Sequence, residues 1–286
     1  MRTLLRTALV AAVAAASIGV VAAPATAAPP PRADSQTRPV LLIHGYATGS
    51  GHDCNSYWNQ ARYWLPRWGW TGTIHTIGYY EANTNCNAVI RRGNHEVPIE
   101  SLGFDLAWWI YNTHSQYGRA VDIIGHSMGG LVARAALTGD QQNWSGWPPY
   151  LYVEDVATLG APHGGKAWWT SPCWTRQCQD MMPDSAFLSR TAPNAQSTSG
   201  TDWTLIGSDS DEVVSTGSAL AMTAGHKLDF DLRSGLTHSG LLNHDVNAID
   251  FKLYFWNYYD PRWIRHTTGS SPLRAARNAI YSWYQW

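Results

Sequence analysis

The sequence has few charged residues and no strongly basic stretch. Charged side chains make up 14% of its 286 residues, with 20 Lys and Arg against 21 Asp and Glu. Without a stripe of basic residues to neutralise phosphates, nucleic acid is excluded as a partner. The chain also shows no internal repeat and no boundary of a second domain. Its length is that of one large domain with a single core.

Only one apolar run is long, and it lies at the N-terminus. Arg2 and Arg6 precede an apolar stretch from about Ala8 to Ala23, and Ala25-Thr26-Ala27 supplies the small residues of a cleavage site. The run is short for a bilayer span and ends in a proline-rich stretch, so a signal peptide is favoured over a membrane anchor. We expect residues 1–27 to be removed on secretion and residues 28–286 to form one extracellular domain without a stable membrane anchor.

Cysteine is scarce as well. The four cysteines show no C-x-x-C spacing, so we expect no metal site. In an exported protein two disulfides are the better interpretation, and four cysteines allow three pairings. We favour Cys54 with Cys86 and Cys173 with Cys178, because each pair is close in sequence and lies in polar loops.

Hydrophobic patterning predicts strands that alternate with helices. Strands are expected at 40–43, within 71–80, and at 121–124, 153–160 and 203–207. Helices are expected from residue 55 or 56 to 68, at 99–117, at 131–137, at 241–258 and from 273 to the end. This alternation implies a mostly parallel sheet with helices on both faces. The irregular segment between Gly160 and Asp202 is long enough to form a cap.

One serine is bracketed by glycines where a strand turns into a helix. In "VDIIGHSMGGLVAR", residues 121–134, the chain must reverse within Gly125-His126-Ser127-Met128-Gly129. The serine at the apex is forced toward positive φ, and the two glycines remove β-carbons that would collide with the neighbouring strand and helix. Such an elbow lifts a hydroxyl above the sheet, so Ser127 is the candidate nucleophile.

A serine nucleophile also needs fixed donors for the oxyanion that forms when it attacks. The Met128 N–H directly follows the serine and is the first candidate. "HGY", residues 44–46, follows the strand at 40–43, and the Tyr46 N–H is the second candidate. His44 could be mistaken for a base, but its place at a strand end before glycine favours a structural role.

Five blocks resemble, in order, the signature blocks of bacterial secreted lipases and esterases of the α/β-hydrolase fold. They read "LLIHGY", "GHSMGGL", "APHGG", "DEVV" and "GLTHSGLL", and together they span roughly residues 39–243. Small Bacillus-type and actinomycete enzymes are the most similar, although the longer segments between blocks and the tryptophan-rich stretches depart from the minimal Bacillus pattern. The resemblance implies one α/β-hydrolase catalytic domain over 28–286, with a mostly parallel central sheet, a loop-rich cap segment and no cofactor.

In that fold an acid and then a histidine follow the serine along the chain. "WTLIGSDSDEVVS" ends a predicted strand and offers Asp209, Asp211 and Glu212. Asp211 matches the family's pattern of aspartate before a small apolar pair, and we favour it over Asp209. A solvated turn or a weak calcium loop is the alternative interpretation, but calcium needs more oxygen ligands than this stretch offers.

The catalytic base is expected on a later loop. His238 in "GLTHSGLL" is flanked by small residues and precedes an apolar helix start, as in the family. His226 and His244 are the alternatives. His163 in "APHGG" resembles the family's threonine-proline-histidine block, with Ala161 where threonine is common, and we expect a structural role for it near the site.

The resemblance implies a secreted serine carboxylic-ester hydrolase that forms an acyl-enzyme. We expect a monomeric lipase that cleaves acylglycerols at an oil-water interface. A polyester or wall-ester hydrolase, a short-chain carboxylesterase, an amide hydrolase with the same triad, and a non-catalytic binding protein on a hydrolase scaffold are the alternatives.

Sixteen tryptophans are many for this length, and most should pack in the core. Five of them are expected in loops at the sheet end where α/β sites lie. They are Trp144, Trp147, Trp168, Trp169 and Trp174. An apolar acyl pocket or interface-binding rim and ordinary loop packing are equally good interpretations of these five residues.

Overall fold

A computed structural model describes residues 29–49, 51–166, 173–242 and 253–282. The predicted signal peptide, 1–27, lies outside these ranges. Within them, no helix combines the length and the apolar character that crossing a membrane requires.

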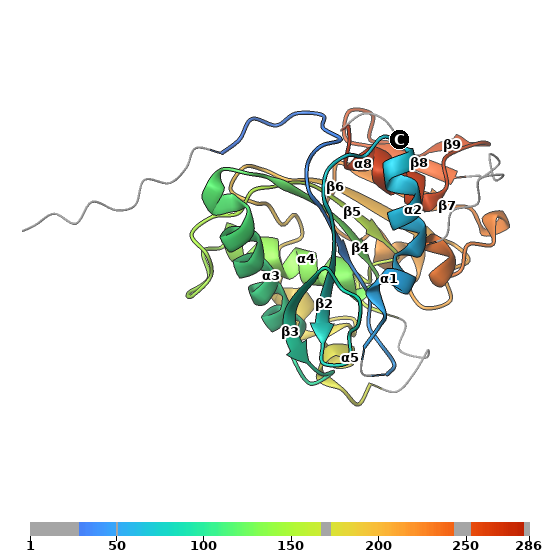
Figure 1. Ribbon diagram of the computed structural model, residues 1–286. Helices are drawn as coiled ribbons and strands as arrows, with labels where there is room; N and C mark the ends of the chain where they lie inside the picture. The colour runs from blue at the N-terminus through green and yellow to red at the C-terminus, as the bar shows by residue number, and fades with distance from the viewer. Residues whose placement is uncertain (1–28, 50, 167–172, 243–252, 283–286) are drawn as a thin grey trace, which may run out of the picture.

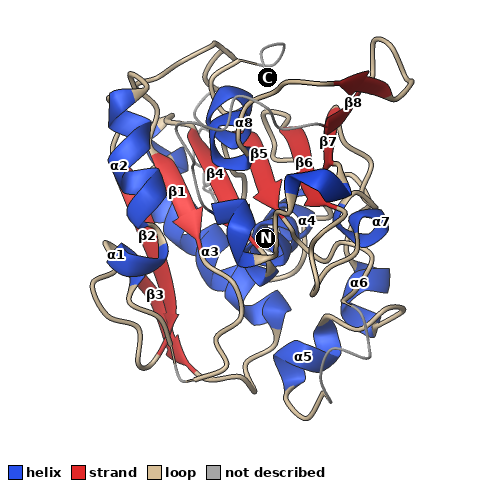
Figure 2. Cartoon of the chain, turned by 90° about the vertical axis from the view of Figure 1, so that its right-hand side faces the viewer, coloured by secondary structure: helices blue, strands red, loops and turns tan. Residues whose placement is uncertain are grey.

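A nine-stranded mixed sheet forms the centre of the described chain, with the order β3-β2-β1-β4-β5-β6-β7-β8-β9. The strands are β1 (Val40–Ile43), β2 (Ile74–Tyr80), β3 (Ala88–Gly93), β4 (Val121–His126), β5 (Val153–Leu159), β6 (Asp202–Ser208), β7 (His226–Phe230), β8 (Leu253–Asn257) and β9 (Ile264–His266). Neighbours from β3 to β7 pair in parallel, and β8 and β9 are antiparallel. Figure 2 shows β1, β4, β5 and β6 side by side. The predicted mostly parallel sheet is confirmed.

Helices cover both faces of the sheet (Figure 1). On one side lie α3 (Ile99–Thr113) and α4 (Met128–Gln141), and on the other lie α1 (Cys54–Tyr57), α2 (Asn59–Arg67) and α8 (Pro272–Ala279). Strand β1 shows why both faces are apolar, because its side chains alternate between two cores. Leu41 and Ile43 join the core with α3 and α4, whereas Val40 and Leu42 join the core with α2 and α8.

The sequence patterns failed at several elements. The helix expected at 241–258 is wrong, because Ser239–Leu242 is a 3₁₀ turn and Leu253–Asn257 is strand β8. Its sequence, "LYFWN", is rich in aromatics that favour a strand once it can pair with the edge of β7. The helix expected from residue 55 or 56 to 68 is divided at Trp58, which ends α1 and precedes α2. Strands β3, β7 and β9 were not predicted.

The segment between β5 and β6 carries α5 (Arg176–Asp180) and α6 (Ala186–Arg190). It approaches the loop after β1, where the Thr175 hydroxyl lies 3.2 Å from the Tyr46 hydroxyl. Disulfides join Cys54 to Cys86 and Cys173 to Cys178, which are the two pairings expected. The remaining elements are α7 (Thr216–Ala219) and the 3₁₀ turns η1 (Ser115–Tyr117), η3 (Leu232–Ser234) and η4 (Ser239–Leu242).

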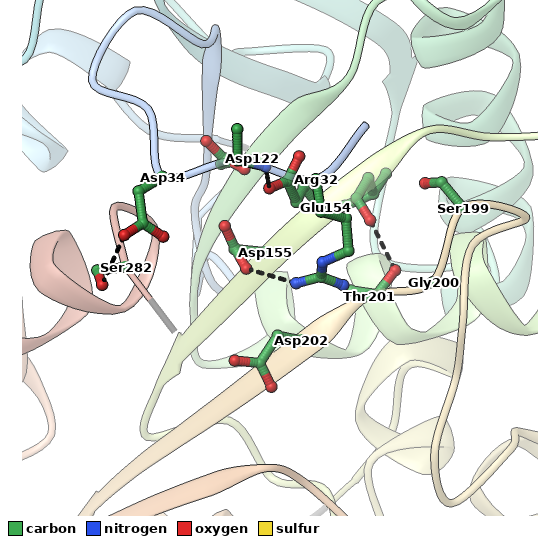
Figure 3. A network of polar contacts seen from close by, with 12 residues as sticks. Arg32, Asp34, Asp122, Glu154, Asp155, Ser199, Gly200, Thr201, Asp202 and Ser282 are labelled. Atoms are coloured by element: carbon green, nitrogen blue, oxygen red, sulfur yellow. Dashed lines mark hydrogen bonds and ion pairs between the residues drawn. The ribbon is translucent and has the colours of Figure 1, made fainter. Parts of the chain in front are cut away.

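The segment before β1 is tied to the sheet end at which the parallel strands begin. The Arg38 guanidinium contacts both oxygens of Asp122 at 3.1 Å and Glu154 at 2.7 Å. Arg32 contacts Asp155 at 3.2 Å, as Figure 3 shows. The Asp122 side chain is fully buried, and burial raises its pKa well above the usual range. Burial also raises the pKa of Asp155 to about 8.

We expect Arg38→Met to destabilise the fold by about 3–5 kcal/mol at pH 8, because buried carboxyl groups lose their cation and must keep a proton at a pH where free carboxyl groups have released it. At pH 5 the loss should shrink to roughly 2 kcal/mol, since protonating a carboxyl costs only about 1.4 kcal/mol for each pH unit above its ordinary pKa. The wild type should itself lose stability as pH rises from about 4 through about 8, because folded Asp155 keeps a proton that the unfolded chain has released.

Urea unfolding at the two pH values measures this effect. Arg32→Met is the matched control, because the Arg32 side chain is 41% exposed and its ion pair should contribute less than about 1 kcal/mol. Equal losses for the two variants at pH 8 would contradict the importance of the buried Arg38 contacts.

Candidate active site

Ser127 stands at the apex of the turn between β4 and α4. Its backbone adopts φ 54°, the left-handed region that a non-glycine residue rarely enters. A β-carbon at Gly125 would lie 2.8 Å from the Gly130 nitrogen, and one at Gly129 would collide with the Ile43 carbonyl oxygen. The Ser127 N–H donates to the Leu159 carbonyl at 2.9 Å, which fastens the turn to the end of β5. The glycines therefore have the steric role that the motif predicts.

Three side chains from distant parts of the sequence meet at this turn. His238 Nε2 lies 2.9 Å from Ser127 Oγ, and His238 Nδ1 lies 2.8 Å from Asp211 Oδ2. Ser127 follows β4 and Asp211 follows β6, so both stand beyond the ends of parallel strands. This is the edge at which α/β sheets place their sites. This is the arrangement in which a serine, a histidine and a carboxylate can act as nucleophile, base and orienting acid.

The Asp211 carboxylate is held in one orientation. Its side chain is fully buried, and Oδ1 accepts the N–H groups of Val213 and Val214 at 2.9 and 2.8 Å. This leaves Oδ2 directed at His238. Gly160 makes room for the pair, because a β-carbon there would lie 2.9 Å from Asp211 Oδ2 and 3.3 Å from His238 Nδ1.

The other two acids of this loop contact different groups. Asp209 accepts the Thr216 hydroxyl at 2.9 Å. Glu212 accepts the backbone N–H of His238 at 3.0 Å, and this bond lowers the pKa of its carboxyl. Glu212 therefore holds the backbone of His238 and not its ring, a role that no sequence pattern indicates. Among the described residues, no group of three or more His, Cys, Asp or Glu side chains is arranged to hold a metal ion.

The remaining candidate histidines contact other groups or lie outside the described residues. His44 is buried and stacks on Tyr79 at 4.2 Å between ring centroids, and burial lowers its pKa to about 3. His226 begins β7 and lies 3.4 Å from Asp202 at the opposite end of β6. His163 is buried and its ring lies 3.2 Å from the Thr158 hydroxyl. His244 is outside the described residues.

The loop after β1 passes directly beside the serine. A β-carbon on Gly45 would lie 2.8 Å from Ser127 Cβ and 3.2 Å from Ser127 Oγ. The Gly45 N–H is already used, because it donates to the Tyr57 hydroxyl at 3.0 Å. Its carbonyl accepts the Tyr79 hydroxyl at 3.1 Å. In a trans peptide the next N–H, that of Tyr46, points the opposite way from this carbonyl.

Met128 is the first residue of α4, a helix of 14 residues. The N-terminus of a helix carries partial positive charge and backbone N–H groups that favour an anion. The two predicted oxyanion donors, the N–H groups of Met128 and Tyr46, therefore belong to the helix that begins at the elbow and to the loop that passes beside Ser127.

Two of the five loop tryptophans do not lie where they were expected. Trp144 and Trp147 follow α4, which returns the chain to the end of the sheet where strands begin, so they are remote from Ser127. Trp147 packs edge-on against Phe104, which is ordinary loop packing. Trp174 is 84% exposed beside Cys173, on the segment that approaches Tyr46. Trp168 and Trp169 lie outside the described residues.

Fold and site together define the class of protein: the chain has the α/β-hydrolase fold. Residues 34–171, just under half of the chain, match the PGAP1-like alpha/beta domain family. That stretch holds the loop after β1 and the serine elbow but ends before Asp211 and His238. No curated protein matches the chain.

Solved structures of bacterial and fungal lipases share the fold. Aspergillus fumigatus lipase B is 14% identical, covers 88% of this chain and 59% of its own, and gives a TM-score of 0.51. The mature form of Bacillus licheniformis lipase BlEst2 is 16% identical, covers 76% of this chain and 89% of its own, and gives 0.50. Its propeptide form is 18% identical over 77% of this chain, with a TM-score of 0.48. This chain spans only half of that propeptide form.

Proposed function

We propose that the protein is a secreted serine hydrolase of carboxylic esters. Ser127 is the nucleophile, His238 the general base, Asp211 the orienting acid, and the Met128 and Tyr46 N–H groups form the oxyanion hole. The observation that carries this proposal is the hydrogen-bonded chain from Ser127 Oγ through His238 to the buried Asp211, at 2.9 and 2.8 Å.

The geometry accounts for each step of ester cleavage. Ser127 Oγ attacks the ester carbonyl carbon while His238 Nε2 takes its proton, and the carbonyl oxygen becomes an oxyanion that accepts the Met128 and Tyr46 N–H groups. When the carbon–oxygen bond to the alcohol breaks, His238 returns the proton to the departing oxygen. Water then attacks the acyl-enzyme by the same path, which releases the carboxylic acid and restores Ser127. Asp211 stays ionised and stabilises the imidazolium.

Acylglycerols are the substrates we propose. Two of the solved structures that share the fold are lipases by name, and Trp174 offers an exposed aromatic beside the loop that bears Tyr46. Two disulfides support secretion, since such bonds persist in oxidising surroundings. We further propose that residues 28–286 form the mature, monomeric catalytic domain after removal of the leader 1–27.

Rates of hydrolysis on three substrates test the proposal. They are an emulsified long-chain triglyceride, a short soluble ester and a polyester film, each assayed with the secreted protein and with protein inactivated by a serine-directed organophosphorus reagent. The proposal expects the untreated protein to cleave the triglyceride fastest. Faster cleavage of the film or of the soluble ester would change the substrate class, and no hydrolysis of any of the three would overturn the function.

A further inference from the structure

A second chain of hydrogen bonds connects the loop that carries His238 to the loop that carries Gly45 and Tyr46. His126 Nε2 lies 3.0 Å from the His238 carbonyl oxygen, and His126 Nδ1 lies 2.5 Å from the Tyr57 hydroxyl. The same hydroxyl accepts the Gly45 N–H at 3.0 Å. Hydrogen bonds therefore connect four groups in series: the His238 carbonyl, the His126 ring, the Tyr57 hydroxyl and the N–H of Gly45, the residue before Tyr46.

The donors and acceptors of this chain run in one direction. The Gly45 N–H can only donate, so the Tyr57 oxygen accepts that hydrogen bond and the Tyr57 hydroxyl donates its own hydrogen bond to His126 Nδ1. His126 must then carry its proton on Nε2, where it donates to the His238 carbonyl. Burial, with the nearby His238 as a smaller cause, holds the pKa of His126 well below the usual range. A neutral His126 is the form that satisfies every partner.

We propose that His126 and Tyr57 are positioning residues, a relay that holds the loop bearing His238 at a fixed distance from the loop bearing the Tyr46 N–H. The inference rests on the proposed function. It gives a role to His126, at a position before Ser127 where the elbow alone does not require histidine. It also gives a role to Tyr57, which lies 69 residues before His126.

The contacts of His238 show why this position matters. Asp211 fixes its ring, Glu212 fixes its backbone N–H, and His126 fixes its backbone carbonyl. Asp211 and Glu212 belong to one loop, so His126 is the one of these three that connects the base to the serine elbow. Displacing a catalytic group by about 1 Å can lower a rate about 100-fold. Loosening the relay should therefore affect the chemical step more than substrate binding.

Tyr57→Phe, His126→Phe and the double variant test the relay, with kcat and KM measured on a short soluble ester. We expect each single variant to lower kcat by about 10-fold or more with KM within about twofold. The His238 ring and the Tyr46 N–H both shift relative to the reacting atoms, which weakens their transition-state contacts and leaves ground-state binding unchanged. The double variant should be no more than about threefold worse than the poorer single variant, because either change breaks the same chain. Multiplicative losses, or an unchanged kcat in Tyr57→Phe, would overturn the relay.

Tyr80→Phe is the matched control. Tyr80 is fully buried, whereas Tyr57 is partly buried. The Tyr80 hydroxyl donates to Gln177 at 2.5 Å, outside the relay. Thermal unfolding should show that both tyrosine variants fold, and only Tyr57→Phe should lose kcat. Labelling of Ser127 by an organophosphorus probe separates the two proposals. A wild type that is not labelled contradicts the proposed function, whereas labelling of Tyr57→Phe at the wild-type rate contradicts the relay alone.

Discussion

Ser127→Ala should lower kcat for ester hydrolysis by about 10⁴-fold or more, since no other group can form the acyl-enzyme. The residual rate would come from the oxyanion donors and from substrate binding. Alanine tolerates the φ of 54° no worse than serine does, so the free energy of unfolding should change by less than about 1 kcal/mol. Initial rates on a soluble ester, together with urea unfolding, measure both effects.

Ser197→Ala is the matched control for this substitution. Ser197 is also buried, but its hydroxyl contacts the Val153 backbone where β5 begins, at the opposite end of the sheet from Ser127. This variant should lose stability and keep its kcat. A Ser127→Ala protein that hydrolyses the ester at the wild-type rate would remove Ser127 from the mechanism.

Asp211→Asn should lower kcat by about 10⁴-fold, because it reverses the tautomer of His238. The asparagine oxygen must face the Val213 and Val214 N–H groups that Asp211 Oδ1 now accepts, so its amide NH₂ faces His238 Nδ1. His238 then carries its proton on Nε2 and cannot take one from Ser127. The loss should fall on kcat, with KM little changed.

Asp209→Asn separates this effect from a general change of the loop. Asp209 lies two residues away, is exposed, and contacts Thr216 instead of His238. We expect its kcat to stay within about threefold of the wild type, as is usual for surface changes away from the reacting groups. Equal losses in Asp209→Asn and Asp211→Asn would contradict the assignment of the acid.

Local sequence patterns predicted the centre of the fold. Strands β1, β4 and β5 are rich in apolar residues and lead into glycine-containing turns, so their type and place could be inferred from a few residues each. The serine elbow was predictable for the same reason, because its glycines avoid collisions that β-carbons would make with the backbone close to the turn. Strand β8 was not predictable in this way, since its conformation depends on pairing with β7 and not on its own spacing.

The site was predictable only in part. The order of motifs along the chain selected Asp211 and His238, and the structure brings both to Ser127. Tyr57 carried no signal, because a tyrosine in a short helix gains its contacts to His126 and Gly45 only when β1 and β4 pair. The role of Glu212 was hidden too, since a carboxylate that accepts a backbone N–H looks the same in sequence as one that orients a ring.

Every step of the proposed mechanism depends on Ser127 as a nucleophile that His238 activates. The most direct test is to incubate the protein with an organophosphorus probe and to locate the adduct by mass spectrometry of its peptides. One adduct on Ser127, formed far more slowly in His238→Ala, is the predicted result. No adduct on Ser127, or equal labelling rates in the two proteins, would contradict the account.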